Sequence, residues 1–377
     1  MPRLPIELCN QIIANLHDEP KSLASCALVC RAWVFVSQRD LFSTLYVHEK
    51  NITPILESLG STPPRFAAYV QHLYFHVYGD LRANMTLRMS KEDRLPLLDR
   101  LLPHLSLFTN VKKLSLDGCR QFVDLQWNIE WTHIIAASFA TLPKLSIMYF
   151  NFEALEHLVD LVASFHDLTH LVVDDIDVEE ASHEYSNEDQ EPYEGSQTPP
   201  PALENIYYSS GDRASGGGPF LRWFAANPGT FKTLHLILDA EAGDINPGVD
   251  LIAAAGDGLQ NLTLSFDDQW QNWEGFELSA NTDLRNLVFR RASDLSDSLP
   301  EIIESIASPL KFITMGFVEE LEESLWPGLV AALSSIPSLK KITFHAGYAK
   351  TAEDWAKDFA EEHPEFAERG IAVFGMP

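Results

Sequence analysis

The stretch LQNLTL, from Leu259 to Leu264, follows the pattern apolar-x-x-apolar-x-apolar and defines a repeat in this chain. Its last four positions alternate inward apolar with outward polar residues, as a half-buried strand does. Ten copies occur in the chain. They are VQHLYF, VKKLSL, LSIMYF, LTHLVV, LENIYY, FKTLHL, LQNLTL, LRNLVF, LKFITM and LKKITF, which start at Val70, Val111, Leu145, Leu168, Leu203, Phe231, Leu259, Leu284, Leu310 and Leu339.

Segments with helical apolar spacing lie between several of these copies, so strand, turn and helix repeat as one unit. One such unit cannot bury its own apolar face, whereas stacked units share a continuous core. The pattern therefore predicts an α/β solenoid with a parallel, concave sheet, and an ordinary doubly wound α/β domain is the alternative. The expected helices span 95–108, 131–142, 152–165, 220–226, 299–307 and 325–335.

The repeated hexapeptide resembles that of leucine-rich repeat domains, over roughly Val70 to Ala346. That family often places Asn or Cys three positions beyond the last apolar residue, and here only Cys119 fits. The resemblance therefore implies an irregular solenoid without a regular asparagine ladder.

Two insertions interrupt the expected solenoid. Residues 179–201 are acidic, contain proline and have few aliphatic side chains, so they cannot offset the entropy of ordering. Residues 209–219 are rich in glycine, but neither Lys-Ser nor Lys-Thr follows and Pro219 lacks a backbone donor, which favours a flexible turn over a phosphate-binding loop. Beyond the repeats, residues 347–377 contain a helical pattern and a short strand pattern, and we expect a C-terminal cap.

The N-terminal stretch LPIELCNQIIANLHDEPKSLASCALVCRAWVFVSQRDLFSTL, from Leu4 to Leu45, has helical periodicity and more apolar residues than its size requires. A helix is expected over residues 5–16, and a second apolar stripe runs from Leu23 through Cys26 and Ala27 to Cys30 and Trp33. Leu28 and Val29 widen this stripe. A unit of about forty residues usually needs a staple or a partner, so it should dock on another protein.

This stretch resembles an F-box. The resemblance is carried by Leu-Pro-x-Glu at Leu4 to Glu7, the hexapeptide LVCRAW from Leu28 to Trp33, and Leu41-Phe42, where many members have tryptophan in place of Phe42. It implies a three-helix module that binds a Skp-type adaptor and so joins a cullin–RING ubiquitin ligase. The residues implied in adaptor binding are Leu4, Pro5, Glu7, Leu8, Ile12, Leu28, Val29, Cys30, Trp33 and Leu41.

These patterns divide the chain into an F-box-like unit at 1–46, a connecting segment at 47–69, the solenoid at 70–346 and the cap at 347–377. The net charge of −27 argues against a broad nucleic-acid or anionic-membrane surface, and the partners expected are therefore proteins. Four cysteines, three of them on apolar helix faces, and no uncharged leader or long apolar run predict a cytoplasmic or nuclear protein.

No catalytic or metal-binding motif stands out. Walker, HExxH, GxSxG and paired CxxC patterns are absent from the sequence. Cys26 and Cys30 with His17 have a spacing that zinc could use, but both cysteines belong to the apolar stripe, where core packing is the better interpretation. We therefore expect no metal, no cofactor and no enzymatic activity of the chain itself.

The residues that alternate with the buried apolar positions should line the concave surface and bind a target. Large amphipathic side chains supply much of the energy at interface centres, and basic residues on an acidic protein suit an acidic or phosphorylated segment. The candidate target-binding residues are Tyr74, His76, Lys113, Asp117, Tyr149, Asn151, Tyr207, His235, Arg290, Lys341 and His345. The sequence thus predicts a substrate receptor of a Skp–cullin–F-box ligase, with a non-degradative interaction scaffold as the alternative and a hydrolase disfavoured by the missing nucleophile motifs.

Overall fold

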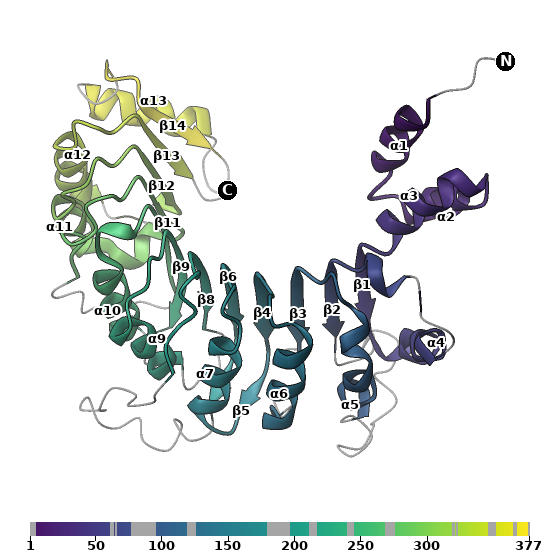
Figure 1. The fold of residues 1–377 in the computed structure, drawn as a ribbon. Coiled ribbons are helices and arrows are strands. Elements are labelled where there is room, and N and C mark those ends of the chain that lie inside the picture. Colours follow the sequence, from purple (N-terminus) through teal and green to yellow (C-terminus); the bar gives the residue numbers. More distant parts are fainter. Residues whose placement is uncertain are drawn as a thin grey trace, which may run out of the picture. The chain divides into compact units, whose positions relative to one another are not determined.

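A computed structural model gives the fold, shown in Figure 1. The structure divides into two compact units, one formed by Met1–Asn151 with Asp160–Leu168 and one formed by Phe152–Val159 with Thr169–Pro377. Each unit is described by itself. The residues that the structure describes are 5–60, 64, 66–76, 96–118, 126–178, 197–210, 217–239, 245–267, 276–318, 321, 323–345, 352–364 and 368–375.

The first unit begins with three helices that enclose a small core. Ile13, Leu23 and Val36 are buried together, one from each helix, and Leu16, Cys26, Trp33 and Leu41 pack against them. The apolar stripe expected from Leu23 to Trp33 is divided between two helices, because the chain leaves the helical conformation at Cys30. The backbone of Cys30 is extended, and its carbonyl oxygen accepts the first hydrogen bond of the next helix. The prediction of one stripe from Leu23 to Trp33 was therefore wrong, since the break is what lets the third helix fold back against the second. The helices are α1 (Ile6–Ala14), α2 (Pro20–Ala27) and α3 (Arg31–Leu41).

The remainder of the first unit is a parallel sheet with helices against one face (Figure 1). Its strand order is β1-β2-β3-β4. The sheet begins at Thr44, ahead of the first hexapeptide copy. The elements are β1 (Thr44–Val47), α4 (Glu49–Gly60), β2 (His72–His76), α5 (Pro96–Leu101), β3 (Lys113–Asp117), α6 (Ile129–Ser138) and β4 (Lys144–Met148), followed at the junction of the units by β5 (Asn151–Phe152) and α7 (Leu155–Ala163).

The second unit repeats the same strand and helix alternation. Its sheet has the order β6-β8-β9-β10-β11-β12-β13-β14, with neighbouring strands parallel. The chain therefore folds as an N-terminal helical unit followed by an α/β repeat solenoid. The elements are β6 (His170–Asp174), β7 (Asp177–Val178), β8 (Asn205–Ser209), α9 (Gly217–Ala226), β9 (Thr233–Asp239), α10 (Ile245–Ala255), β10 (Asn261–Asp267), β11 (Asn286–Phe289), α11 (Leu299–Glu304), β12 (Phe312–Gly316), α12 (Trp326–Ser334), β13 (Lys341–His345), α13 (Ala352–Glu362) and β14 (Ala372–Gly375).

The predicted register holds in every hexapeptide copy but one. In LQNLTL, for example, Leu262 and Leu264 are buried while Thr263 between them is half-buried on the opposite face. The third copy was predicted three residues too far toward the C-terminus. In β4 it is Leu145 and Ile147 that align with Leu114 and Leu116 of β3, so this copy reads LPKLSI from Leu142. The sequence allowed both frames, because its apolar residues are too closely spaced to fix the alternation.

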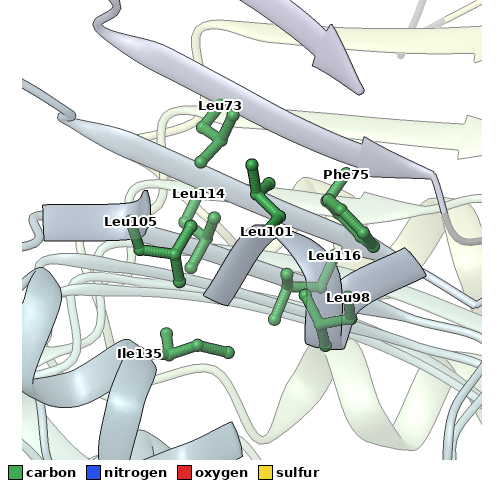
Figure 2. A pocket seen from close by; sticks show the side chains of 8 residues that line it. All are labelled: Leu73, Phe75, Leu98, Leu101, Leu105, Leu114, Leu116 and Ile135. Carbon is green, nitrogen blue, oxygen red and sulfur yellow. The ribbon is translucent and has the colours of Figure 1, made fainter. Parts of the chain in front are cut away.

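The buried face of the first unit's sheet packs on α5 and α6. The gap that remains between them is about 10 Å³, room for at most one water molecule, and its lining is entirely hydrocarbon. Figure 2 shows that these side chains converge from strands and helices as a core does, without any polar group that a ligand could use. The lining residues are Leu73, Phe75, Leu98, Leu101, Leu105, Leu114, Leu116 and Ile135.

The sequence pattern did not predict α10, which contains Pro247 and Gly248. Proline is tolerated in the first turn of a helix, where its missing N–H has no partner to lose. Gly248 is needed for packing, because a Cβ there would lie 2.5 Å from Leu238 Cδ1 of β9. The glycine that disguises this helix in the sequence therefore allows it to approach the sheet.

Some expectations fall outside the described residues. They concern most of the insertion at 179–201, the centre of that at 209–219, and Cys119. The described end of the first insertion contacts α9 within the second unit, since the backbone oxygen of Gln197 accepts a hydrogen bond from Trp223 Nε1 at 3.0 Å.

The register predicts that alanine substitutions at two adjacent residues of one strand lower the free energy of unfolding by different amounts. Leu262→Ala removes a fully buried side chain and should lower the free energy of unfolding by about 2 to 5 kcal/mol. Thr263→Ala, on the opposite face, should change it by less than about 1 kcal/mol. Denaturant titrations of both variants test this, and equal losses would show that the register is wrong.

Candidate protein-binding surfaces

The N-terminal helices expose apolar side chains that their own core does not use. On α1, Leu8 and Ile12 lie one turn apart on the same side of the helix, and Ile12 is 54% exposed. Between α2 and α3, Leu28 is 88% and Val29 63% exposed. Such side chains on so small a unit form a candidate protein-binding surface.

The residues implied in adaptor binding separate into two groups in the structure. Trp33 and Leu41 are half-buried and pack against the core of the three helices, so they support the surface more than they form it. Leu4 lies outside the described residues. The exposed members are Pro5, Glu7, Leu8, Ile12, Leu28, Val29 and Cys30.

The face of the first unit's sheet opposite its helices carries an aromatic and polar cluster. Tyr74 lies at its centre, 5.3 Å from the ring of Tyr46 and 6.5 Å from that of His76. Its hydroxyl donates a hydrogen bond to Asp117 Oδ2, and Nδ1 of His76 lies 3.0 Å from the same oxygen. His72 Nε2 is 3.0 Å from Ser115 Oγ. Neighbouring strands thus connect their open-face side chains into one network.

Burial perturbs the titrating groups of this cluster. It raises the pKa of Tyr74, with the hydrogen bond to Asp117 as the next contribution. Burial also lowers the pKa of His72 to about 4, and the charge of Lys113 acts in the same direction. At neutral pH Tyr74 and His72 are therefore uncharged.

The sequence placed Asp117 on an accessible surface, and this was wrong. Asp117 is only 8% exposed, because Tyr74 and His76 from the neighbouring strand lie over it. Tyr46 was not selected from the sequence although it is 57% exposed beside Tyr74. It belongs to a strand that precedes the hexapeptide copies, so the repeat pattern could not identify it.

Tyr149 and Asn151 do not occupy the strand positions assigned to them, because the third copy was misplaced. Tyr149 follows the end of β4 with φ of 60°, and Asn151 begins β5. The open-face positions of this copy are Ser146 and Met148, which align with Ser115 and Asp117. Tyr149 is nevertheless close enough to Tyr74 to contribute to its raised pKa.

The open face of the second unit's sheet has a separate cluster around Tyr207 and His235. Their ring centroids are 4.4 Å apart. Burial raises the pKa of Tyr207, with Asp174 as the next contribution, and lowers the pKa of His235 to about 4, with Arg290 acting in the same direction. Arg290 and Lys341 are exposed, and His345 is half-buried on the same face.

A ladder of amide side chains runs along this face. Asn286 Nδ2 donates to Asn261 Oδ1, and Asn261 Nδ2 donates to Thr233 Oγ1 at 3.2 Å. These three side chains occupy the third position of three successive hexapeptides, before each strand's buried pair. The expected lack of a regular asparagine ladder concerned a different position, three residues beyond the last apolar residue, and stays a prediction.

The described part of the chain offers no metal site and no membrane-spanning helix. No group of three or more His, Cys, Asp or Glu side chains lies close enough to hold a metal ion, and Cys9, Cys26 and Cys30 are free thiols. Within the same residues, no helix is long and apolar enough to cross a bilayer.

The comparison with protein families decides the nature of the N-terminal unit. The model of the F-box-like family matches residues 1–48. The chain contains an F-box-like domain. Its three helices and exposed apolar residues are therefore those of an F-box-like domain, joined to a repeat solenoid.

The comparisons with curated sequences and with solved structures do not extend this assignment. No curated protein sequence matches the chain. One solved structure with a similar chain is described as "Crystal structure of Rad7 and Elc1 complex in yeast", at 12% identity and a TM-score of 0.42, covering 97% of this chain and 92% of that one. A likeness at this level does not transfer an activity or a partner.

The Tyr74 hydrogen bond should stabilise the first unit. Tyr74→Phe leaves the buried carboxylate of Asp117 without this donor and should lower the free energy of unfolding by about 1 to 3 kcal/mol. Tyr46→Phe, which alters an exposed neighbour in the same cluster, is the matched control and should have little effect. Equal behaviour of the two variants in denaturant titrations would contradict a stabilising role for the Tyr74–Asp117 bond.

The lowered histidine pKa values predict a pH dependence of stability. In the folded chain His72 and His235 remain neutral down to about pH 4, whereas the unfolded chain binds protons on them below about pH 6.5. Their contribution is therefore complete above pH 6.5 and is lost as the pH falls toward 4. Relative to the wild type, His72→Gln with His235→Gln should lose less stability between pH 7 and pH 4.5, measured by thermal melting. A difference that is constant with pH would contradict this assignment.

Proposed function

We propose that this protein is an adaptor-binding receptor of a Skp–cullin–F-box ubiquitin ligase. The observation that carries the proposal is the exposed apolar surface of the F-box-like domain, whose members Leu8, Ile12, Leu28 and Val29 lie outside the small core of Ile13, Leu23 and Val36. Burial of these side chains against a Skp-type adaptor would remove apolar area from water without rearranging the helices.

The solenoid would then capture the target protein. Its sheet carries helices on one face, and the opposite face presents the Tyr46–Tyr74 and Tyr207–His235 clusters. Tyrosine is favoured at the centres of interfaces because its ring is large, rigid and amphipathic. The protein would act as the recognition subunit, and ubiquitin transfer would be performed by its partners.

Adaptor binding can be tested with two exposed residues. Ile12→Glu with Leu28→Glu places charges on the apolar surface and should weaken binding to a purified Skp-type adaptor by about a hundredfold or more, because both side chains would be desolvated in the interface. Ile134→Glu, at a partly exposed apolar position on α6 outside the F-box-like domain, is the matched control and should bind normally. Calorimetry with all three proteins, each checked for an unchanged melting temperature, gives the comparison.

Wild-type affinity in the Ile12→Glu, Leu28→Glu variant would contradict the proposal. A scaffold without a role in degradation remains the alternative function. Co-purification of a cullin with the tagged protein through the adaptor favours the ligase receptor, whereas adaptor binding without any cullin favours the scaffold.

A further inference from the structure

A row of cations lies at the end of the second unit's sheet where β11, β12 and β13 begin. Arg285, Lys311 and Lys340 occupy the second position of successive hexapeptides, and Lys341 follows as the first residue of β13. We call these four residues the basic edge. Arg285, Lys340 and Lys341 are exposed and Lys311 is half-buried.

The backbone fixes the spacing of the basic edge. The carbonyl oxygen of Arg285 accepts a hydrogen bond from the amide of Lys311 at 2.9 Å, and that of Lys311 accepts one from the amide of Lys340 at 2.9 Å. Arg285, Lys311 and Lys340 therefore lie at the starts of adjacent strands, about 4.8 Å apart in the backbone. Lys341 follows Lys340 in the chain. Arg285, Lys311 and Lys340 share the second hexapeptide position, whereas Lys341 shares the third position with Phe312 and lies with it on the open face of the sheet.

Three members of the basic edge have no ion-pair partner within the described part of the chain. Arg285 has one carboxylate at 3.8 Å, from Asp283, and no ion pair joins Lys311, Lys340 or Lys341 to any described residue. By contrast, Lys232, at the same hexapeptide position two copies earlier, is paired with Glu204 of the neighbouring strand. Like charges side by side on a sheet are destabilising, so the basic edge does not contribute to the fold. On a chain of net charge −27, cations without ion-pair partners, as at Lys311, Lys340 and Lys341, are typical of a binding surface.

An apolar side chain adjoins the basic edge. Phe312 is aligned with Lys341 in the pairing of β12 with β13, and it is 43% exposed. Ile313 and Met315 of the same strand are buried, so Phe312 lies on the open face of the sheet. An aromatic ring beside Lys341, at the same edge as the other cations, suits a ligand that is anionic and also carries an apolar group.

We propose that the basic edge and Phe312 bind an extended anionic segment of a partner protein, with carboxylates or phosphates against the cations and one apolar side chain against Phe312. An extended chain rises about 3.3 Å per residue, so a few residues cover the width of three strands. The inference rests on the proposed function only in taking this segment to belong to the captured target. The high negative charge elsewhere on the chain disfavours nucleic acid, which needs a long cationic track.

Peptide binding by the full-length protein tests this surface. The probes are three fluorescein-labelled peptides of about ten residues, each with one central leucine. The other positions are mostly glutamate in the first peptide, phosphoserine in the second and glutamine in the third. A single-stranded oligothymidine of similar length is the fourth probe. Fluorescence polarisation should show that the anionic peptides bind about tenfold or more tightly than the glutamine peptide. Raising the salt from about 0.1 M to about 0.5 M should remove most of this difference.

Variants then locate the binding. Lys311→Glu with Lys341→Glu should weaken the binding of the anionic peptides by about tenfold or more. Phe312→Ser should weaken the binding of peptides with the central leucine, but not of otherwise identical peptides in which glycine replaces that leucine. The matched control is Lys357→Glu, an exposed lysine on α13 of the same unit, which should leave binding unchanged. Glutamate binding assigns a carboxylate-rich segment, and binding of the phosphoserine peptide alone assigns a phosphorylated one.

Three results would overturn the proposal. The glutamine peptide could bind as tightly as the anionic peptides, or the Lys311→Glu, Lys341→Glu variant could keep the wild-type affinity for the anionic peptides. The third is tighter binding of the oligonucleotide than of either anionic peptide. The adaptor assay separates this inference from the proposed function. The basic-edge variant should bind the adaptor normally, and the Ile12→Glu, Leu28→Glu variant should bind the peptides normally, so the failure of one surface is distinguishable from the failure of the other.

Discussion

The solenoid depends on one recurring constraint, the burial of two apolar side chains from each strand against helices on the same face of the sheet. Leu262 and Leu264, for example, are almost completely buried, and their strand is fixed by parallel pairing with strands on both sides. No single strand and helix could exclude water from these side chains, so each repeat depends on its neighbours. Parallel register follows, because a slip of one residue would expose the apolar set of a strand.

This constraint leaves the other face of the sheet free to vary. Side chains there do not pack under helices, and the residues that alternate with the buried pairs differ from strand to strand: tyrosine and histidine in the clusters around Tyr74 and Tyr207, amides in the ladder through Asn261 and Asn286, and a lysine beside Phe312. The fold thus separates stability from recognition. Networks such as Tyr74 with Asp117 show that the separation is incomplete, since a side chain on the open face can also cover and hydrogen-bond a buried carboxylate.

The F-box-like domain shows the same separation at a smaller scale. Its core is made by three residues, Ile13, Leu23 and Val36. Apolar side chains within about one helical turn of these core residues in the sequence remain exposed. The break at Cys30 is essential to this arrangement, because it turns the chain between α2 and α3 and leaves Leu28 and Val29 outside the core. The proposed adaptor surface is therefore a consequence of how a very short sequence divides its apolar residues between core and exterior.

The sequence by itself determined the repeat, the strand faces and the F-box-like motif, because alternation with period two and a contiguous motif are local properties of the chain. It could not place the third copy, where Leu145, Ile147 and Met148 permit two frames and only pairing with β3 selects one. Nor could it predict α10, since Gly248 acquires its meaning from the nearby side chain of Leu238. The burial of Asp117 and the grouping of Arg285, Lys311 and Lys340 were decided by the tertiary structure, because both depend on strands that parallel pairing brings together from distant parts of the sequence.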